Sequence, residues 1–210
     1  MYCPEREYSI PELIQKADCG DREIMRTAVE LFEAEDYLAD GEIRGRYLAY
    51  LETLAGEGDP EACIRLGDAC LNGTAGPQDP GEAVLWYEKA AELGNGAGYE
   101  RIGRLYYEGK AVPADYRKAF EFFARNKGQE SFETLYAPGE MYQQGLYVSR
   151  DLEKACRYYR RIVYADIGFP ELDAYYARAC RRLAEAMRTG DGEEPDPDEA
   201  GRLMEKARAC

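Results

Sequence analysis

Glycine recurs along this chain at a fixed step of 36 residues, in the series Gly67, Gly103 and Gly139. Four further columns keep the same step: Gly73, Gly109 and Gly145; Asp79, Asp115 and Asp151; Ala83, Ala119 and Ala155; and the aromatic pairs Trp86–Tyr87, Phe122–Phe123 and Tyr158–Tyr159. A period of roughly 20–50 residues indicates a solenoid, in which one supersecondary unit cannot bury its apolar face alone. We therefore expect a repeat protein that offers a binding scaffold.

Each 36-residue unit is predicted to be a pair of antiparallel α-helices, A and B. In the first clear unit, the segment 59–61 (Asp-Pro-Glu) starts helix A, because aspartate caps free amides and proline fits the first helical position. Gly73 ends that helix. Asp79 and Glu82 then form an expected capping box that starts helix B.

The repeat register divides the 210 residues into three parts of one predicted repeat domain. Residues 1–58 hold a capping helix at 9–19 and a degenerate unit at 22–57, and residues 59–163 hold three clear repeats. Residues 164–210 are a degenerate last repeat, whose helix A is expected to run from Pro170 to about Arg188. Atypical end units are expected because terminal repeats need a polar outer face.

The periodic glycines lie inside predicted helices, where each destabilises the helix by up to about 1 kcal/mol relative to alanine. Their repetition predicts that helix B approaches helix A so closely that a Cβ would clash. Pro138 precedes Gly139 and lacks an amide. It therefore predicts a helix A that is kinked or starts late in the third repeat.

The columns together resemble the Sel-one-like repeat family, which is related to tetratricopeptide repeats. The resemblance covers about residues 60–163, with Leu66-Gly67, Gly73, Asp79, Ala83 and Trp86-Tyr87-Glu88-Lys89-Ala90-Ala91 in its first copy. It implies an all-α, right-handed solenoid of antiparallel helix pairs. The family's usual role implies an adaptor in protein complexes.

The composition of the chain limits the kinds of molecule that it is expected to bind. The net charge is −14, from 27 basic and 41 acidic residues, and a surface this acidic disfavours nucleic acid, whose binding depends on Lys and Arg contacts. No apolar run is long enough to predict membrane insertion. The first residues carry no signal-peptide pattern, and the seven cysteines are scattered. We expect reduced thiols, no intramolecular disulfide and a cytoplasmic protein.

The residues offer little for catalysis. The chain contains no histidine, and its three serines lie outside hydrolase motifs. Residues 103–110 resemble a phosphate-binding loop, but five residues separate the glycines where four are needed, and Ala111 replaces the magnesium ligand. The acidic run at 191–199 lacks the spacing of an EF-hand loop and is interpreted as a solvated loop. No enzyme, cofactor or metal is expected.

The candidate site is the groove lined by successive A helices, placed there by analogy with tetratricopeptide repeats. Tyrosine and arginine are the expected anchors, because they dominate interface energetics. The predicted partner-binding residues are Asp68, Leu71, Glu100, Arg104, Tyr107, Tyr136, Glu140, Gln143, Arg181, Glu185 and Arg188. The predicted function is a noncatalytic adaptor that binds a peptide or protein. An acidic inhibitor or immunity-type protein that blocks a basic effector enzyme is the alternative, and a carboxylate hydrolase is a third.

Overall fold

The computed structural model describes residues 8–35, 37–126, 131–164 and 174–209. Within these ranges the chain forms eleven α-helices, one short 3-10 helix and no strand, which confirms the all-α fold class. The helices are α1 (Ile10–Asp18), α2 (Arg22–Ala34), η1 (Tyr37–Ala39), α3 (Gly41–Gly56), α4 (Pro60–Asn72), α5 (Pro80–Glu92), α6 (Ala97–Glu108), α7 (Tyr116–Arg125), α8 (Phe132–Gln144), α9 (Leu152–Val163), α10 (Ala174–Thr189) and α11 (Pro197–Ala209).

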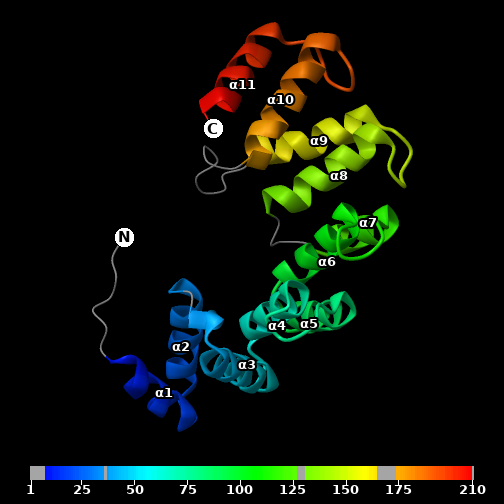
Figure 1. Cartoon of the computed structure of the whole chain (residues 1–210). Helices are drawn as coiled ribbons and strands as arrows, with labels where there is room; N and C mark the ends of the chain where they lie inside the picture. Colours follow the sequence, from blue (N-terminus) through cyan, green and yellow to red (C-terminus); the bar gives the residue numbers. More distant parts are fainter. Residues whose placement is uncertain (1–7, 36, 127–130, 165–173, 210) are drawn as a thin grey trace. The chain divides into compact units, whose positions relative to one another are not determined.

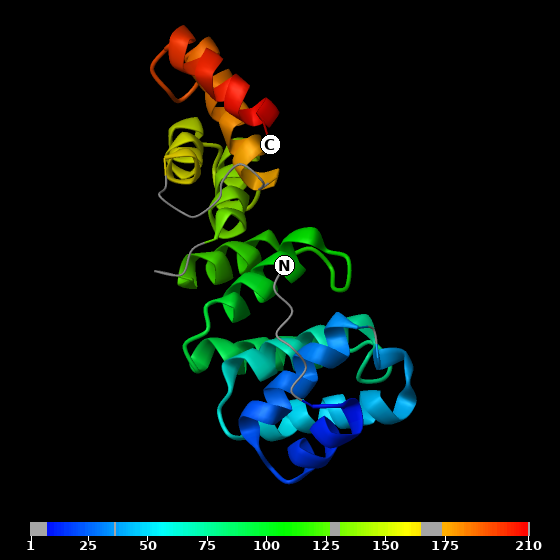
Figure 2. The same ribbon diagram turned by 90° about the vertical axis from the view of Figure 1, so that its left-hand side faces the viewer.

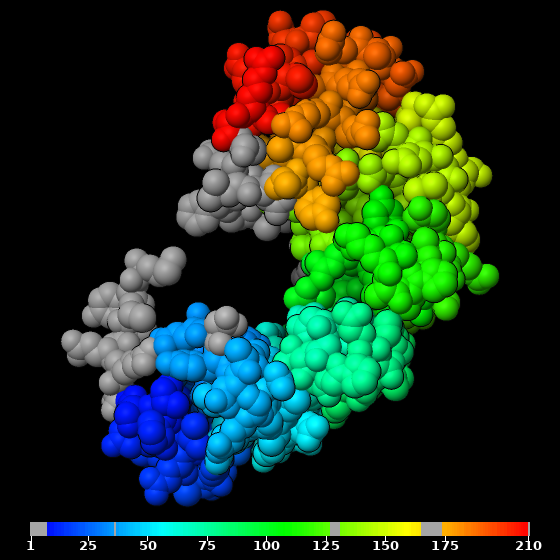
Figure 3. All heavy atoms as spheres, viewed as in Figure 1, coloured from blue at the N-terminus to red at the C-terminus, as the bar shows by residue number. Residues whose placement is uncertain are grey.

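The chain divides into two compact units, residues 1–98 and residues 99–210, and each is described by itself. Within each unit the helices pack in sequential pairs, such as α4 with α5 and α8 with α9 (Figures 1 and 2). On the face that the space-filling view shows, no open gap separates the atoms of α8 from those of α9 (Figure 3). The expected degenerate unit at 22–57 is the pair α2 and α3, and the expected capping helix is α1. That the whole chain forms a single repeat domain stays a prediction.

Side-chain caps start the helices where the sequence predicts them. The carboxylates of Asp79, Asp115 and Asp151 each accept a hydrogen bond from the amide three residues later, at 2.9–3.0 Å. The structure shows this half of the box expected between Asp79 and Glu82. A full capping box joins Ser9 and Glu12 at α1. Because each cap accepts a hydrogen bond from a backbone amide in the first turn of its helix, the caps determine where these helices begin.

The periodic glycines lie against aromatic rings of the B helices. A Cβ added to Gly103 would lie 2.7 Å from ring carbons of Phe123, and one added to Gly139 would lie 2.8 Å from the Tyr159 ring. Gly67 meets the ring of Tyr87 even more closely. Real Cβ atoms essentially never approach within 3.0 Å, and interiors packed like crystals cannot yield. The packing explanation for this column is therefore confirmed.

Pro138 was expected to kink its helix or to delay its start; the late start is wrong, and the kink stays a prediction. Helix α8 begins at Phe132, in register with Pro60 of α4, and Pro138 lies inside it. The cause is a strong cap: the Ser131 amide donates to the Thr134 hydroxyl at 2.8 Å, and the Thr134 amide donates to the Ser131 hydroxyl at 3.2 Å. The cap starts the helix upstream of the proline. The start expected at Pro170 for the last helix A lies outside the described residues.

Most of the described cysteines are core residues. Cys63, Cys70, Cys156 and Cys180 are buried and Cys19 is exposed, and none of these five described cysteines forms a disulfide. Burial raises the pKa of the Cys70 and Cys156 thiols to about 11, so both are protonated at neutral pH. These thiols therefore fill space and are poor nucleophiles. The other two, at positions 3 and 210, lie outside the described residues.

We predict that Gly103→Ala destabilises the protein, because the new methyl overpacks the contact with Phe123. Overpacking costs about 1–3 kcal/mol, which outweighs a gain of up to about 1 kcal/mol in helix propensity. The matched control is Gly201→Ala in α11, where an added Cβ meets nothing within 4 Å. Urea unfolding should show Gly103→Ala less stable than wild type and Gly201→Ala more stable. Equal stabilisation by both substitutions would contradict the packing account.

Candidate functional site

Polar side chains connect the three A helices of the second unit, α6, α8 and α10. Arg104 of α6 forms an ion pair with Glu133 of α8 at 3.4 Å. Tyr107 of α6 donates a hydrogen bond of 2.6 Å to Glu140 of α8. Glu140 also lies 3.7 Å from a guanidinium nitrogen of Arg178 and 3.9 Å from one of Arg182, both on α10. These contacts cross one helix after another and define what we call the A-helix face of this unit.

The repeat explains why these side chains are available to neighbouring helices. Asp68, Arg104 and Glu140 occupy one repeat column, but only Asp68 accepts the hydroxyl of its own B helix, from Tyr87 at 2.7 Å. In the next repeat the ring is Phe123, which has no hydroxyl to satisfy. In the third repeat the Tyr159 hydroxyl donates instead to the side chain of Gln143 at 2.8 Å. Arg104 and Glu140 are thereby left to pair along the A-helix face.

An aromatic platform lies beside this polar chain. The Tyr136 ring lies 5.5 Å from that of Tyr159 and 5.6 Å from that of Tyr175. The Arg178 guanidinium lies over Tyr136 at 4.5 Å and over Tyr175 at 5.8 Å. Arg178 remains 47% exposed, whereas Tyr136 is only 2% exposed. The platform therefore presents a cation on a surface whose supporting rings are packed.

Burial controls the charges at this face. Burial is the main cause that raises the pKa of Glu133, and the positive charge of Arg104 opposes it. Burial, followed by the hydrogen bond to Glu140, raises the pKa of Tyr107 far above its usual value. Tyr107 is therefore protonated at neutral pH and donates to the carboxylate. Partial burial works to lower the pKa of Arg182, but its hydrogen bond with Tyr136 and the nearby acidic groups raise it overall.

The structure brings together only part of the predicted set. Arg104, Tyr107, Tyr136 and Glu140 cluster as described, although Tyr136 and Glu140 are buried and support the face from below. Asp68 and Gln143 are occupied by tyrosine hydroxyls of their B helices. Four others take no part in the cluster: Leu71 and Glu100 are half-buried, Arg188 is exposed, and Arg181 donates to the Ala207 carbonyl at 3.1 Å. Glu185 is exposed and lies 4.0 Å from Arg182. That any of these residues binds a partner stays a prediction.

Sequence reasoning missed Glu133, Tyr175, Arg178 and Arg182. The last three belong to α10, on which the repeat columns assigned Arg181, Glu185 and Arg188 to the groove instead. A signal for Glu133 did exist in the sequence. Arg104 stands in the column of Asp68 where the facing ring is phenylalanine, so an unsatisfied cation implied a carboxylate on the next A helix.

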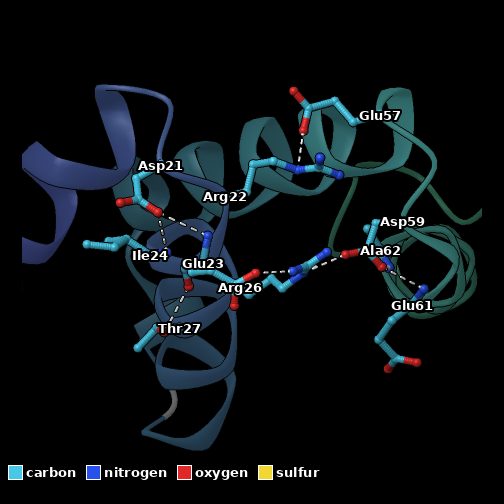
Figure 4. Close-up of polar contacts among 10 residues, drawn as sticks. All are labelled: Asp21, Arg22, Glu23, Ile24, Arg26, Thr27, Glu57, Asp59, Glu61 and Ala62. Atoms are coloured by element: carbon cyan, nitrogen blue, oxygen red, sulfur yellow. Dashed lines mark hydrogen bonds and ion pairs between the residues drawn. The ribbon is translucent and has the colours of Figure 1, made fainter.

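The first unit has a related arrangement between α2 and α4. Arg26 of α2 donates to Asp59, which caps α4, at 2.7 Å and also pairs with Glu23 at 2.5 Å (Figure 4). Farther along the helices, Arg65 pairs with Glu33. Between these pairs lies a shallow pocket of about 220 Å³. Buried apolar residues at its floor are Val29, Leu51, Leu54 and Ala62.

The Asp59 carboxylate caps helix α4 and also forms an ion pair with Arg26. Burial alone would raise its pKa, but hydrogen bonds from Arg26 and from the Ala62 and Glu61 amides outweigh burial and lower it. The carboxylate is therefore charged at neutral pH. It holds the first turn of α4 against α2, which fixes one wall of the pocket.

Other candidate features are accounted for by contacts within the fold. In the acidic run, Glu193 pairs with Arg160 at 2.7 Å, and Glu199 accepts from the Tyr164 hydroxyl at 2.8 Å and from Arg202 at 2.6 Å. Across the described residues, no cluster of His, Cys, Asp or Glu could hold a metal ion. Nor does any described helix have both the length and the apolar character needed to cross a membrane.

Comparison with known families identifies the repeat. The profile of the Sel1 repeat matches residues 60–95, 97–125, 133–164 and 177–210, which is more than half of the chain. The chain belongs to the Sel1-repeat family. The match includes the fourth, degenerate repeat that the sequence register predicted. Sel1-repeat proteins are typically protein-interaction scaffolds and generally noncatalytic.

Two curated proteins share part of the sequence with this Sel1-repeat chain. DAP3-binding cell death enhancer 1 of Mus musculus is 33% identical over 111 residues, which are 53% of this chain and 21% of the mouse protein. The ERAD-associated E3 ubiquitin-protein ligase component HRD3A of Arabidopsis thaliana is 32% identical over 82 residues. Those residues are 39% of this chain and 12% of the plant protein. The shared part is thus a small fraction of both relatives.

Solved structures support the Sel1-repeat fold over nearly the whole chain. A Sel1 repeat protein from Oxalobacter formigenes superposes with a TM-score of 0.72 at 22% identity, covering 95% of this chain and 77% of the other. A protective antigen of uropathogenic Escherichia coli strains, also with this fold, gives a TM-score of 0.63 at 22% identity. It covers 96% of this chain and 49% of the antigen. At such identities the likeness shows the fold alone.

We predict that Tyr107→Phe destabilises the protein by about 1–3 kcal/mol, because it removes a donor from a buried carboxylate. Glu140 is only 8% exposed and cannot recruit water freely in its place. The matched control is Tyr99→Phe in the same helix, whose hydroxyl makes no hydrogen bond with the described residues. Thermal unfolding monitored by circular dichroism compares the two variants. Equal melting temperatures for Tyr107→Phe and wild type would mean that the hydroxyl does not stabilise the face.

Proposed function

We propose that this Sel1-repeat protein is a noncatalytic adaptor that binds a protein or peptide partner on the A-helix face of its second unit. The contact surface would centre on Arg104, Tyr107 and Arg178. The observation that carries the proposal is the half-exposed Arg178 held over two tyrosine rings and beside a buried glutamate.

The physical support is the kind of surface that these residues make. Interface energy concentrates in a few tyrosine, tryptophan and arginine residues that are surrounded by packed groups. Here the side chains of Arg178 and Arg104 are 47% and 33% exposed, and the network beneath them fixes their positions. Ordering these cations before binding reduces the entropy lost when a partner arrives.

Names of relatives add a second kind of support. The mouse relative is named for binding DAP3, and the Arabidopsis relative is named as a component of a ubiquitin ligase. Both names describe proteins that assemble with other proteins. Sel1 repeats match residues 60–95, 97–125, 133–164 and 177–210 of this chain, so these repeats are the part expected to serve that purpose here.

The net charge of −14 favours a second candidate, an inhibitor that blocks a basic effector enzyme. An inhibitor of that kind would form a tight complex whose association rate falls steeply with ionic strength. The adaptor depends instead on the local contacts of Arg104 and Arg178. Partner affinity measured at low and high salt separates the two candidates.

The test is partner binding by the double variant Arg104→Ala with Arg178→Ala. Affinity purification from the native organism would supply the partner, and its Kd would be measured by calorimetry. We expect the double variant to bind at least about tenfold more weakly, a loss of about 1.4 kcal/mol. Its melting temperature should fall, because the largely buried carboxylates of Glu133 and Glu140 lose these cations. Binding is therefore measured at a temperature at which circular dichroism shows the variant to be folded.

The matched control is Arg157→Ala with Arg202→Ala, on the B helices α9 and α11 of the same unit. Both side chains are exposed and each forms one ion pair within its own helix, so the change in net charge is identical. Unchanged affinity in the first variant and lost affinity in the control would show that the A-helix face is the wrong surface.

A further inference from the structure

The second unit has two adjoining pockets at its loop edge, away from the polar chain of the A-helix face. The larger, of about 720 Å³, lies between α7, α9 and the loop that joins α8 to α9. The smaller, of about 590 Å³, lies between α6, the start of α7 and the preceding loop. Tyr147 lines both pockets. Volumes of this size are typical of sites that take a ligand.

The two pockets contain the same arrangement of a lysine, a tyrosine ring and a capping aspartate. In the smaller pocket, Lys118 lies over the Tyr106 ring at 4.6 Å and beside the helix cap Asp115. In the larger pocket, 36 residues later, Lys154 lies over the Tyr142 ring at 5.2 Å, beside the cap Asp151. Successive repeats therefore present the same cation and ring twice along one edge. An extended chain that followed this edge would meet both.

Tyr147 is not part of the repeat, since Ala111 and Ala75 stand at the equivalent positions. Its φ is +66°, and among the described residues no other non-glycine has a positive φ. The Val148 amide donates to the Leu146 carbonyl at 2.8 Å, which closes a three-residue turn of the rare positive-φ kind around Tyr147. This backbone places a 54% exposed ring between the pockets, against Phe120 at 6.2 Å.

The charge at this edge is opposite to that of the whole protein. Five cations line the two pockets against three carboxylates: Arg117, Lys118, Arg125, Arg150 and Lys154 against Asp115, Glu121 and Asp151. Two of the carboxylates are helix caps that already accept backbone amides, and Glu121 pairs with Arg117. Among the described residues, neither Arg125 nor Arg150 has a carboxylate partner. Arg125 lies over the Phe122 ring at 5.1 Å, and Arg150 donates to the Gln143 carbonyl at 3.2 Å.

We propose that the two pockets flanking Tyr147 bind a short acidic peptide segment of a protein partner, with an aromatic or aliphatic side chain inserted against Phe120, Tyr142 and Tyr147. Carboxylates of the segment pair with Arg125 and Arg150. The three lining carboxylates interrupt any continuous basic strip, which suits spaced acidic side chains better than a phosphate backbone. This surface is separate from the A-helix face, and the chemistry of its partner differs from the basic partner that the net charge favours.

The test selects binders from a random dodecapeptide library displayed on phage, using the purified full chain. We expect the enriched peptides to carry net negative charge and at least one tyrosine, phenylalanine or leucine. Fluorescence anisotropy of the most enriched peptide then gives its Kd. The variant Arg125→Glu with Arg150→Glu should raise that Kd at least tenfold. The control variant Arg157→Glu with Arg208→Glu, exposed positions of the same unit outside the pockets, should change it by less than twofold.

A second variant tests Tyr147 itself. Tyr147→Gly relieves the positive-φ backbone, so its melting temperature should equal or exceed that of wild type, while the peptide Kd rises at least tenfold. The variant Arg104→Ala with Arg178→Ala should bind the peptide as wild type does, which keeps this proposal distinguishable from the adaptor proposal. Enrichment of neutral or basic peptides, no enrichment at all, or equal binding to the charge-reversed variant would overturn it.

Discussion

The contact between an A-helix glycine and a B-helix aromatic ring is the constraint on which the rest of the structure depends. Gly67 meets Tyr87, Gly103 meets Phe123 and Gly139 meets Tyr159, in each case too closely for a side chain to fit. Because the ring of the B helix packs directly against the backbone of the A helix, this contact determines how the two helices of a pair are positioned. The opposite side of each A helix is thereby left for its neighbours and for solvent. The same contact that builds the core therefore decides which residues can form a functional surface.

Whether the B-helix ring carries a hydroxyl group determines which contacts the polar residues of the A helix make. A tyrosine at the ring position needs an acceptor, and Asp68 or Gln143 supplies it. A phenylalanine needs none, so Arg104 turns to Glu133 on the next A helix. Small changes within the repeat core thus redistribute charge on the surface. Two features stand outside this scheme, the arginine-rich α10 and the Tyr147 loop, and both proposals of a binding surface use them.

Periodicity made the fold predictable. The 36-residue columns predicted the helix pairs, the caps at Asp79 and Asp115, and the reason for the glycines, because each rests on local geometry repeated three times. The late start expected from Pro138 was wrong, because a cap at Ser131 begins the helix upstream of the proline. The candidate surface was predicted only in part. Contacts such as Tyr107 with Glu140 join separate repeats, and which of several acceptors a hydroxyl takes depends on packing that spacing alone does not determine.

A double-mutant cycle between Gly103 and Phe123 tests the glycine–ring account most directly. The variants are Gly103→Ala, Phe123→Leu and the combination, with free energies of unfolding measured in urea. If the methyl is rejected by the ring, the smaller leucine should accept it. Gly103→Ala should then destabilise the Phe123→Leu background less than wild type, by a coupling energy of about 1 kcal/mol or more. Additivity within about 0.5 kcal/mol would show that the glycine is needed for another reason and would contradict the account.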